Sequence, residues 1–109
     1  MNFDEYQKQA RKFAVYESSY YPFLGLTEEV GEFIGLAAKL ERGDSIEERF
    51  GSLDGLREAA MKEAGDILWQ LSQCLKEMYI SMQEVAEMNL KKLEDRQQRG
   101  VLKGSRDNR

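Results

Sequence analysis

Two short stretches of the sequence each carry a pair of acidic residues three positions apart. Glu29 and Glu32 lie in "EEVGE", and Glu63 and Asp66 lie in "EAGD". On a helix, side chains at positions i and i+3 stand close enough to act on one ligand. Carboxylate oxygens are the ligands that magnesium prefers, so this spacing predicts a magnesium site, with manganese as the alternative ion.

The helices that must position these acids carry them on apolar faces. Apolar residues form a continuous arc over residues 25–43, where Glu29 falls inside the arc and Glu32 lies at its edge. Glu63 borders the apolar stripe of the next long helix, and Asp66 lies one turn further on. Carboxylates are rarely buried unless something pairs with them. If the two helices pack antiparallel, the four carboxylates face one cleft and cannot all stay ionised without a cation.

The abundance of acids supplies an alternative interpretation. With 20 acidic residues in 109, an isolated Glu-Glu-x-x-Glu arises easily by chance. Glu28 and Glu29 also fall in a predicted first helical turn, where acids interact favourably with the helix dipole. Each pair alone is therefore more typical of a solvated helix face. The two pairs share one spacing, however, and each meets an apolar face, so together they favour a site.

The overall composition is that of a soluble, mildly acidic protein with a net charge of −4. This charge disfavours nucleic acid as a partner. There is no run of eighteen apolar residues and no basic-then-apolar leader, so we expect a cytoplasmic protein that makes no membrane contact. The single cysteine, Cys74, is expected to be a core residue. The absence of histidine excludes histidine bases, Ser-His and Cys-His pairs and nearly all catalytic zinc sites.

The spacing of apolar residues predicts an all-α fold, a bundle of four to five helices forming one domain over residues 1–109. The first helix is expected over 3–17, before a turn marked by proline and glycine. Thr27 is the expected N-cap of the second helix, which ends before Gly43. Stripes this long on so short a chain are expected to be buried partly between subunits.

The second half of the chain is also expected to consist of helices separated by short polar segments. Residues 43–55 are polar and bounded by glycine, which predicts a loop with one helical turn. A long helix is expected over 56–79. Ser81 then begins a Ser-x-x-Glu capping box, and the last helix is expected to continue to Arg99 before Gly100.

The inner face of that last helix changes from apolar to polar along its length. Asn89, Lys92 and Arg96 follow the apolar positions of this face. An amide and cations beside a carboxylate site suit a triphosphate, whose charge exceeds what one metal ion neutralises. A charged helix end is the alternative for Arg96, because basic residues are common there.

Four aromatic residues near the acids could receive a nucleotide base, although each is more typical of a core position. They are Tyr20, Tyr21, Phe23 and Trp69. Trp69 lies off the main apolar stripe of its helix, so it is a candidate for substrate contact or for a subunit contact.

These residues together resemble the MazG-like nucleotide pyrophosphohydrolases of the all-α NTP pyrophosphatase superfamily. The signature of that group is Glu-Glu-x-x-Glu, a spacer, and Glu-x-x-Asp, which stands here as "EEVGE" and "EAGD". The stretch "YYPFLGLTEEVGE" is similar to the family's approach to its first motif, and "NLKKLEDRQQRGVLKGSRDNR" is similar to its closing helix and tail. The resemblance covers nearly the whole chain.

The resemblance implies magnesium-dependent hydrolysis of nucleoside or deoxynucleoside triphosphates between the α and β phosphates. The products are a monophosphate and pyrophosphate, and the implied role is house-cleaning of the nucleotide pool. The implied assembly is a homodimer or a homotetramer built as a dimer of dimers. The implied site residues are the metal ligands Glu29, Glu32, Glu63 and Asp66, the nucleotide contacts Asn89 and Lys92, and Glu28 behind the ligands or beside the attacking water.

Several alternatives stay open. A related pyrophosphatase acting on dUTP or phosphoribosyl-ATP uses a similar carboxylate site. A nucleotide sensor with little turnover and a non-enzymatic helical module that binds a basic partner are the others. Two features depart from the family pattern, namely a long spacer of thirty residues (33–62) and Arg106 in place of a glycine in the tail.

Overall fold

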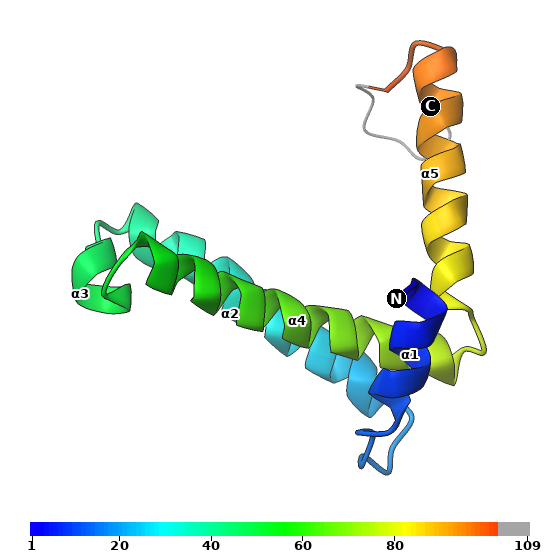
Figure 1. Ribbon diagram of the computed structural model, residues 1–109, viewed down its shortest axis with the longest axis horizontal. Coiled ribbons are helices and arrows are strands. Elements are labelled where there is room, and N and C mark those ends of the chain that lie inside the picture. The colour runs from blue at the N-terminus through cyan, green and yellow to red at the C-terminus, as the bar shows by residue number, and fades with distance from the viewer. Residues whose placement is uncertain (103–109) are drawn as a thin grey trace.

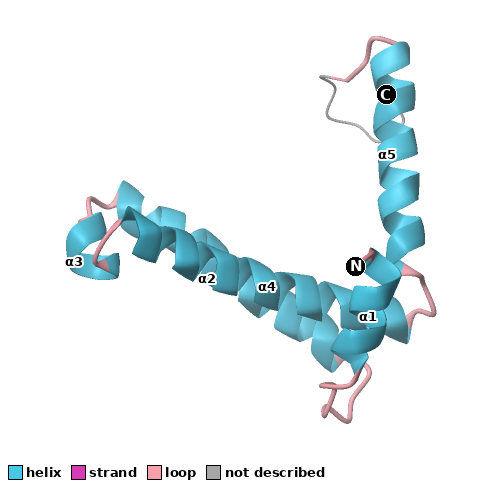
Figure 2. Cartoon of the chain, in the orientation of Figure 1, coloured by secondary structure: helices cyan, strands magenta, loops and turns pink. Residues whose placement is uncertain are grey.

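The computed structural model describes residues 1–102, and within that range its regular structure is entirely helical (Figures 1 and 2). The all-α prediction is therefore confirmed. The tail that carries Arg106 lies outside the described residues. In chain order the helices are α1 (Phe3–Arg11), α2 (Tyr21–Glu41), α3 (Ile46–Phe50), α4 (Leu53–Glu77) and α5 (Met82–Gln98).

The helices form an L with two limbs. Helices α2 and α4 run side by side as one limb, which we call the arm, and α3 packs on α4 at the far end of the arm (Figure 1). Helix α1 packs against α4 at the other end, the elbow, and also against α5. Helix α5 then leaves the elbow as the second limb and extends away from the arm (Figure 1).

Serine side chains fix where three of the helices begin. The hydroxyls of Ser45, Ser52 and Ser81 accept hydrogen bonds from the backbone N–H groups three residues later, which start α3, α4 and α5. Such caps satisfy N–H groups that the first helical turn leaves without partners. The capping box at Ser81 and the helical turn inside the 43–55 loop are confirmed, whereas the cap at Ser52 starts α4 three residues before the predicted position.

The predicted boundary between the first two helices is wrong at both ends. Helix α1 stops at Arg11 instead of continuing to residue 17, and α2 begins at Tyr21 with Pro22 in its first turn. Thr27 does not cap α2, because it lies inside the helix and its hydroxyl donates to the carbonyl of Phe23 at 3.4 Å. Proline at a helix start has no N–H to leave unpaired, so it competes well with a threonine cap.

The protomer buries few apolar side chains on its own. Ala10, Pro22, Cys74 and Met82 are the buried apolar side chains of the described residues, and the core position predicted for Cys74 is confirmed. Polar residues fill much of the remaining interior, including Ser72 and Gln73, which are fully buried. Among the described residues, no helix is both long and apolar enough to cross a membrane.

Candidate metal centre

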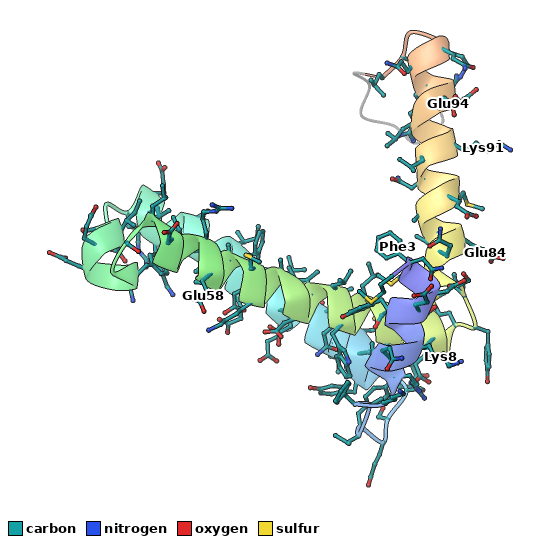
Figure 3. All side chains as sticks on the ribbon, viewed as in Figure 1. Phe3, Lys8, Glu58, Glu84, Lys91 and Glu94 are labelled. Carbon is teal, nitrogen blue, oxygen red and sulfur yellow. The ribbon has the colours of Figure 1, made fainter. Side chains whose placement is uncertain are left out.

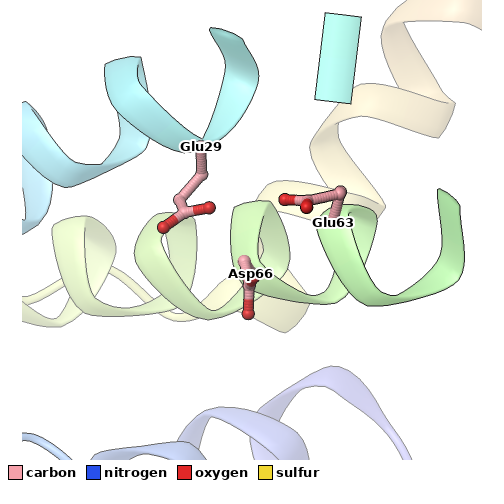
Figure 4. A group of neighbouring side chains, drawn as sticks. All are labelled: Glu29, Glu63 and Asp66. Atoms are coloured by element: carbon pink, nitrogen blue, oxygen red, sulfur yellow. The ribbon is translucent and has the colours of Figure 1, made fainter. Parts of the chain in front are cut away.

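Three carboxylates from the two arm helices converge on one point. Glu29 extends from α2 toward α4, while Glu63 and Asp66 stand one turn apart on α4 (Figure 4). One oxygen from each of the three lies within 4.8 Å of the others. The structure thus brings together three of the four carboxylates that the sequence nominates as metal ligands.

Helices α2 and α4 approach each other closely near these acids, so Glu29 on α2 lies beside Glu63 and Asp66 on α4. Gly25 lies one turn before Glu29, and Gln70 lies one turn after Asp66. The amide of Gln70 fills the space beside Gly25, where an added Cβ would stand 2.6 Å from Gln70 Nε2. Glycine is needed here because Gln70 is itself 94% buried and has little room to move away.

Burial and the charges of the cluster both act on Glu29. Partial burial, followed by the negative charges of Asp66 and Glu63, raises the pKa of the Glu29 carboxyl above its ordinary value. The negative charges of Glu28 and Glu32 raise the Glu29 pKa further, so these two carboxylates are close enough to interact with Glu29 electrostatically. Burial and repulsion both disfavour the ionised form, so these acids gain from a cation that offsets their charge.

Glu32 and Glu28 occupy the margin of the cluster. Both side chains are exposed, and neither belongs to the group whose oxygens lie within 4.8 Å. Glu32 follows Glu29 by almost one helical turn, so it remains on the side of α2 from which a fourth ligand can be supplied.

Tyr6 is a neighbour of the cluster that the sequence did not indicate. Burial and the negative charge of Asp66 raise the pKa of the Tyr6 phenol, so α1 brings this ring within electrostatic reach of the acids. In the sequence, Tyr6 is one residue of the helix expected over 3–17. Tyr6 lies near Asp66 because of the way α1 crosses α4, and the spacing of residues within one helix does not reveal that crossing.

Within one protomer, the polar face of α5 does not meet the carboxylates. Asn89 and Lys92 are exposed on the second limb, which extends away from the arm. Figure 3 shows this separation, with Lys91 and Glu94 on α5 and Glu58 on the arm. The expectation that the last helix faces the cluster is therefore not met inside a single chain. Arg96, expected on the same face, is buried to 96%.

Trp69 lies in an aromatic wall one turn beyond Asp66. Its indole Nε1 donates to the carbonyl of Ala10 at 3.0 Å, and its ring meets Tyr16 edge-on at a centroid distance of 6.4 Å. Tyr16 stacks on Tyr21 at 5.5 Å. A cavity of about 420 Å³ opens against this wall and is lined by Val15, Tyr16, Glu17, Ser18, Tyr21 and Trp69.

A polar cluster behind the wall holds Tyr16 in place. Arg11 Nη1 donates to the Tyr16 hydroxyl oxygen at 2.7 Å and to Glu77 Oε2 at 2.9 Å. The Tyr16 hydroxyl donates to Glu77 Oε2 at 2.6 Å. These hydrogen bonds, that of Tyr16 first and that of Arg11 second, lower the pKa of the Glu77 carboxyl. The sequence placed Tyr16 on a helix and so missed it as a wall of the cavity.

Comparison with known families agrees with this geometry. The MazG nucleotide pyrophosphohydrolase domain matches residues 19–101, which include the candidate acids Glu28, Glu29, Glu32, Glu63 and Asp66 and the whole of α5. The chain belongs to the MazG family. A relative, the Gene 37 protein of Mycobacterium phage L5, is 31% identical over 123 residues, an alignment that covers 100% of both chains. No solved structure matches the chain significantly.

Membership of the MazG family confirms the resemblance seen in the sequence and indicates a nucleotide pyrophosphohydrolase at the level of the family. The name of the phage relative refers to its gene and states no activity.

Proposed function

We propose that this MazG protein hydrolyses nucleoside or deoxynucleoside triphosphates between the α and β phosphates, with magnesium as the metal and manganese as a substitute. The products are a monophosphate and pyrophosphate. The observation that carries the proposal is the convergence of Glu29, Glu63 and Asp66 in a chain of this family. We infer that the protein cleans the nucleotide pool of the cytoplasm.

The donor set fits a hard divalent cation. The three converging groups are carboxylates, and burial together with the negative charges of Asp66 and Glu63 raises the pKa of Glu29. Magnesium binds through a few carboxylates and leaves other positions for water and phosphate oxygens. We assign Glu29, Glu63 and Asp66 as its ligands, with Glu32 as the fourth. A bound magnesium ion supplies positive charge that offsets the charge of the phosphate oxygens.

The aromatic cavity explains why the α phosphate would be attacked. The wall formed by Trp69 begins one helical turn, about 5 Å, from Asp66. A base held by Tyr16, Tyr21 and Trp69 is joined to the α phosphate by a single ribose. The α phosphorus would therefore lie nearest the carboxylates, and the β and γ phosphates would extend beyond them. We assign to Glu28, at the margin of the cluster, a role either behind the metal ligands or as the acceptor of a proton from the attacking water.

Product analysis tests the proposal. Purified protein is incubated with magnesium and each of the eight common NTPs and dNTPs, together with dUTP and phosphoribosyl-ATP, and the products are resolved. An Asp66→Asn variant and a magnesium-free sample run alongside. Glu58→Gln is the matched control, because Glu58 is an exposed acid on the same helix and pairs with Lys62 at 3.4 Å.

We expect equal amounts of monophosphate and pyrophosphate from the wild type and from Glu58→Gln. Both products should fall at least about 100-fold in Asp66→Asn and without magnesium. Diphosphate with orthophosphate would show that another bond is cleaved. Absence of turnover with every substrate would leave the helical binding module as the better account.

A further inference from the structure

We propose that the elbow holds a second ligand site, a cavity between α1 and α4 that binds a small phosphate anion, pyrophosphate above all. This cavity, which we call the elbow cavity, measures about 270 Å³ and is lined by Asp4, Gln7, Lys8, Arg11 and Lys76. Three of these five residues are cationic, whereas the metal centre is built from carboxylates. The two sites therefore favour ligands of opposite charge.

One face of α1 meets the end of α4 at this cavity. The four lining residues of α1 follow one another at the i, i+3, i+4 and i+7 positions that share a helix face. Lys76 lies in the last turn of α4, against which α1 packs. Figure 3 shows Lys8 on α1 at the elbow. The crossing of the two helices thus gathers cations that lie far apart in the sequence.

The two lysines of the elbow cavity are available to an anion. In the part of the chain that the structure describes, neither Lys8 nor Lys76 forms an ion pair or donates a side-chain hydrogen bond. Asp4, the acid of the lining, serves the start of α5, where its Oδ1 accepts from the Ser81 hydroxyl at 2.7 Å and from the Gln83 N–H at 3.3 Å. An ammonium carries three N–H donors, and its charge-assisted bonds to phosphate are strong. An anion in the cavity would give both lysines a partner.

Arg11 supplies the third cation and connects the elbow cavity to the aromatic wall. Its Nη1 makes the contacts to Tyr16, Gln73 and Glu77, at 2.7, 3.0 and 2.9 Å. The N–H groups of Nε and Nη2 have no hydrogen-bond partner among the described residues. A guanidinium binds phosphate through such a planar pair of donors. Arg11 can therefore bind a phosphate group in the elbow cavity while its Nη1 holds Tyr16 in the wall.

The size of the elbow cavity favours a small anion over a whole nucleotide. At about 270 Å³ it is smaller than the roughly 300–1,000 Å³ of pockets for drug-sized ligands. The two phosphoryl groups of pyrophosphate allow it to reach Arg11 and a lysine at the same time, whereas orthophosphate offers the same oxygens on a single phosphorus. Pyrophosphate is also a product of the proposed function, but the elbow cavity goes beyond that function and depends on residues of its own.

Calorimetric titration in metal-free buffer tests the elbow cavity separately from the metal centre. Low-salt buffer is stripped of divalent ions on a chelating resin, so that the carboxylates repel an anion instead of binding it through a metal. The wild type is titrated with sodium pyrophosphate and, separately, with sodium orthophosphate. Lys8→Gln and Lys76→Gln each remove one cation from the cavity. Lys12→Gln is the matched control, because Lys12 follows α1 outside the lining and donates to Gln9 at 2.8 Å.

We expect the wild type and Lys12→Gln to bind one pyrophosphate per chain, and to bind it more tightly than orthophosphate. Lys8→Gln and Lys76→Gln should each weaken pyrophosphate binding at least about 10-fold, because each removes a charge-assisted hydrogen bond. Asp66→Asn should bind pyrophosphate like the wild type, since it alters the metal centre and leaves the elbow intact.

The same affinity in all three lysine variants would overturn the proposal, because it would show that no lysine of the cavity is specific to the anion. Lack of binding by the wild type would overturn it too, as would an altered affinity of Asp66→Asn, which would place the anion at the metal centre. Orthophosphate bound as tightly as pyrophosphate would contradict pyrophosphate as the ligand. These titrations involve no triphosphate hydrolysis, so failure here is distinguishable from failure of the proposed function.

Discussion

Glu29 occupies an unfavourable position for an ionised side chain, and this position suggests how the site responds to metal. It is partly buried and shares its surroundings with Glu63 and Asp66, so its pKa is raised. Without a cation the cluster costs stability, and neutralising one acid relieves repulsion. With a cation the same acid becomes a ligand, and its loss weakens binding. A single substitution should therefore have opposite effects in the two conditions.

We expect Glu29→Gln to raise the midpoint of thermal unfolding in metal-free buffer and to abolish the rise that magnesium gives the wild type. At 100 times the dissociation constant, magnesium adds about 2.7 kcal/mol to the wild type. This corresponds to a rise on the order of 10 °C for a chain of this size. Differential scanning calorimetry with and without magnesium measures both effects. Glu58→Gln should respond to magnesium like the wild type, and a normal response of Glu29→Gln would remove Glu29 from the ligand set.

Gly25 is a second residue with a defined effect, because it makes room for Gln70. Alanine usually stabilises a helix over glycine by about 1 kcal/mol, but overpacking a buried site typically costs about 1–3 kcal/mol. We expect Gly25→Ala to lower the free energy of unfolding by about 1 kcal/mol, measured by urea denaturation. Gly31→Ala, whose added Cβ meets nothing within 4 Å, should raise it by up to about 1 kcal/mol. Equal stabilisation by both would show that Gln70 yields freely.

At the scale of the helices, the sequence predicted a helix start best where a short capping motif marks it. The Ser-x-x-Glu pattern at Ser81 marked the start of α5 because the cap and its N–H partner lie three residues apart. The end of α1 carried no such mark. Phe13 and Tyr16 continue the helical spacing, yet Tyr16 leaves the helix to bond with Glu77, sixty-one residues away. A contact of that range cannot be read from local periodicity.

The candidate site also has a part that the sequence predicted and a part that it did not. The i, i+3 spacing on α4 was sufficient to pair Glu63 with Asp66, and the opposed apolar faces brought Glu29 to them. The position of Asn89 depended instead on the direction in which α5 leaves the elbow. Contacts between α1 and the start of α5 hold it there, among them those of Gln7 and Asp4, and such long-range contacts have no signature in the sequence.

Gln7 acts as a clamp between α1 and the turn before α5. Its Nε2 donates to the carbonyls of Ser72 and Ile80 at 3.2 and 3.1 Å, and its Oε1 accepts from the backbone N–H of Met82 at 3.0 Å. We expect Gln7→Ala to lower the free energy of unfolding by about 2–3 kcal/mol, since these buried backbone groups lose their partners. Gln9→Ala, on the exposed side of α1, should change it by less than about 0.5 kcal/mol in the same urea titration. A cost for Gln7→Ala no greater than that of Gln9→Ala would show that other contacts hold the elbow.

The Arg11, Tyr16 and Glu77 cluster should make one part of the stability depend on pH. The folded state lowers the pKa of Glu77 below its ordinary 4.5, so this stabilisation is present above pH 4.5 and is lost as pH falls through the folded pKa. We expect Glu77→Gln to be less stable than the wild type at pH 7, with the difference shrinking as pH falls below 4.5. Glu94→Gln on α5 is the control for general acid effects. A difference that stays constant from pH 7 to pH 3 would show that the Glu77 charge is not responsible.

At the scale of the whole molecule, the L shape leads us to expect that folding and assembly are parts of one equilibrium. The chain exposes 8389 Å², whereas a compact monomer of this mass exposes about 6,200 Å². Two chains that each buried this difference, roughly 2,200 Å², would form an interface of the obligate class. The arm would then acquire from its partner the apolar core that it lacks alone. For such a dimer a tenfold dilution lowers the free energy of unfolding by about 1.4 kcal/mol per dimer, so the unfolding midpoint falls with concentration.

Ile34 tests this coupling because it lies on the exposed apolar face of the arm and outside the carboxylate cluster. We expect the wild type to sediment as a dimer and Ile34→Glu to sediment as a monomer at the same concentration, since a buried unpaired charge opposes the interface. Its triphosphate hydrolysis should fall with the dimer fraction and recover partly at high protein concentration, because its own carboxylates and α5 residues are intact. Phe13→Glu places the same charge on a residue that is 72% exposed outside the helical limbs, and should leave both assembly and activity unchanged. A monomeric Ile34→Glu with full activity would show that each chain carries a complete site, and a dimeric one would place the interface elsewhere on the arm.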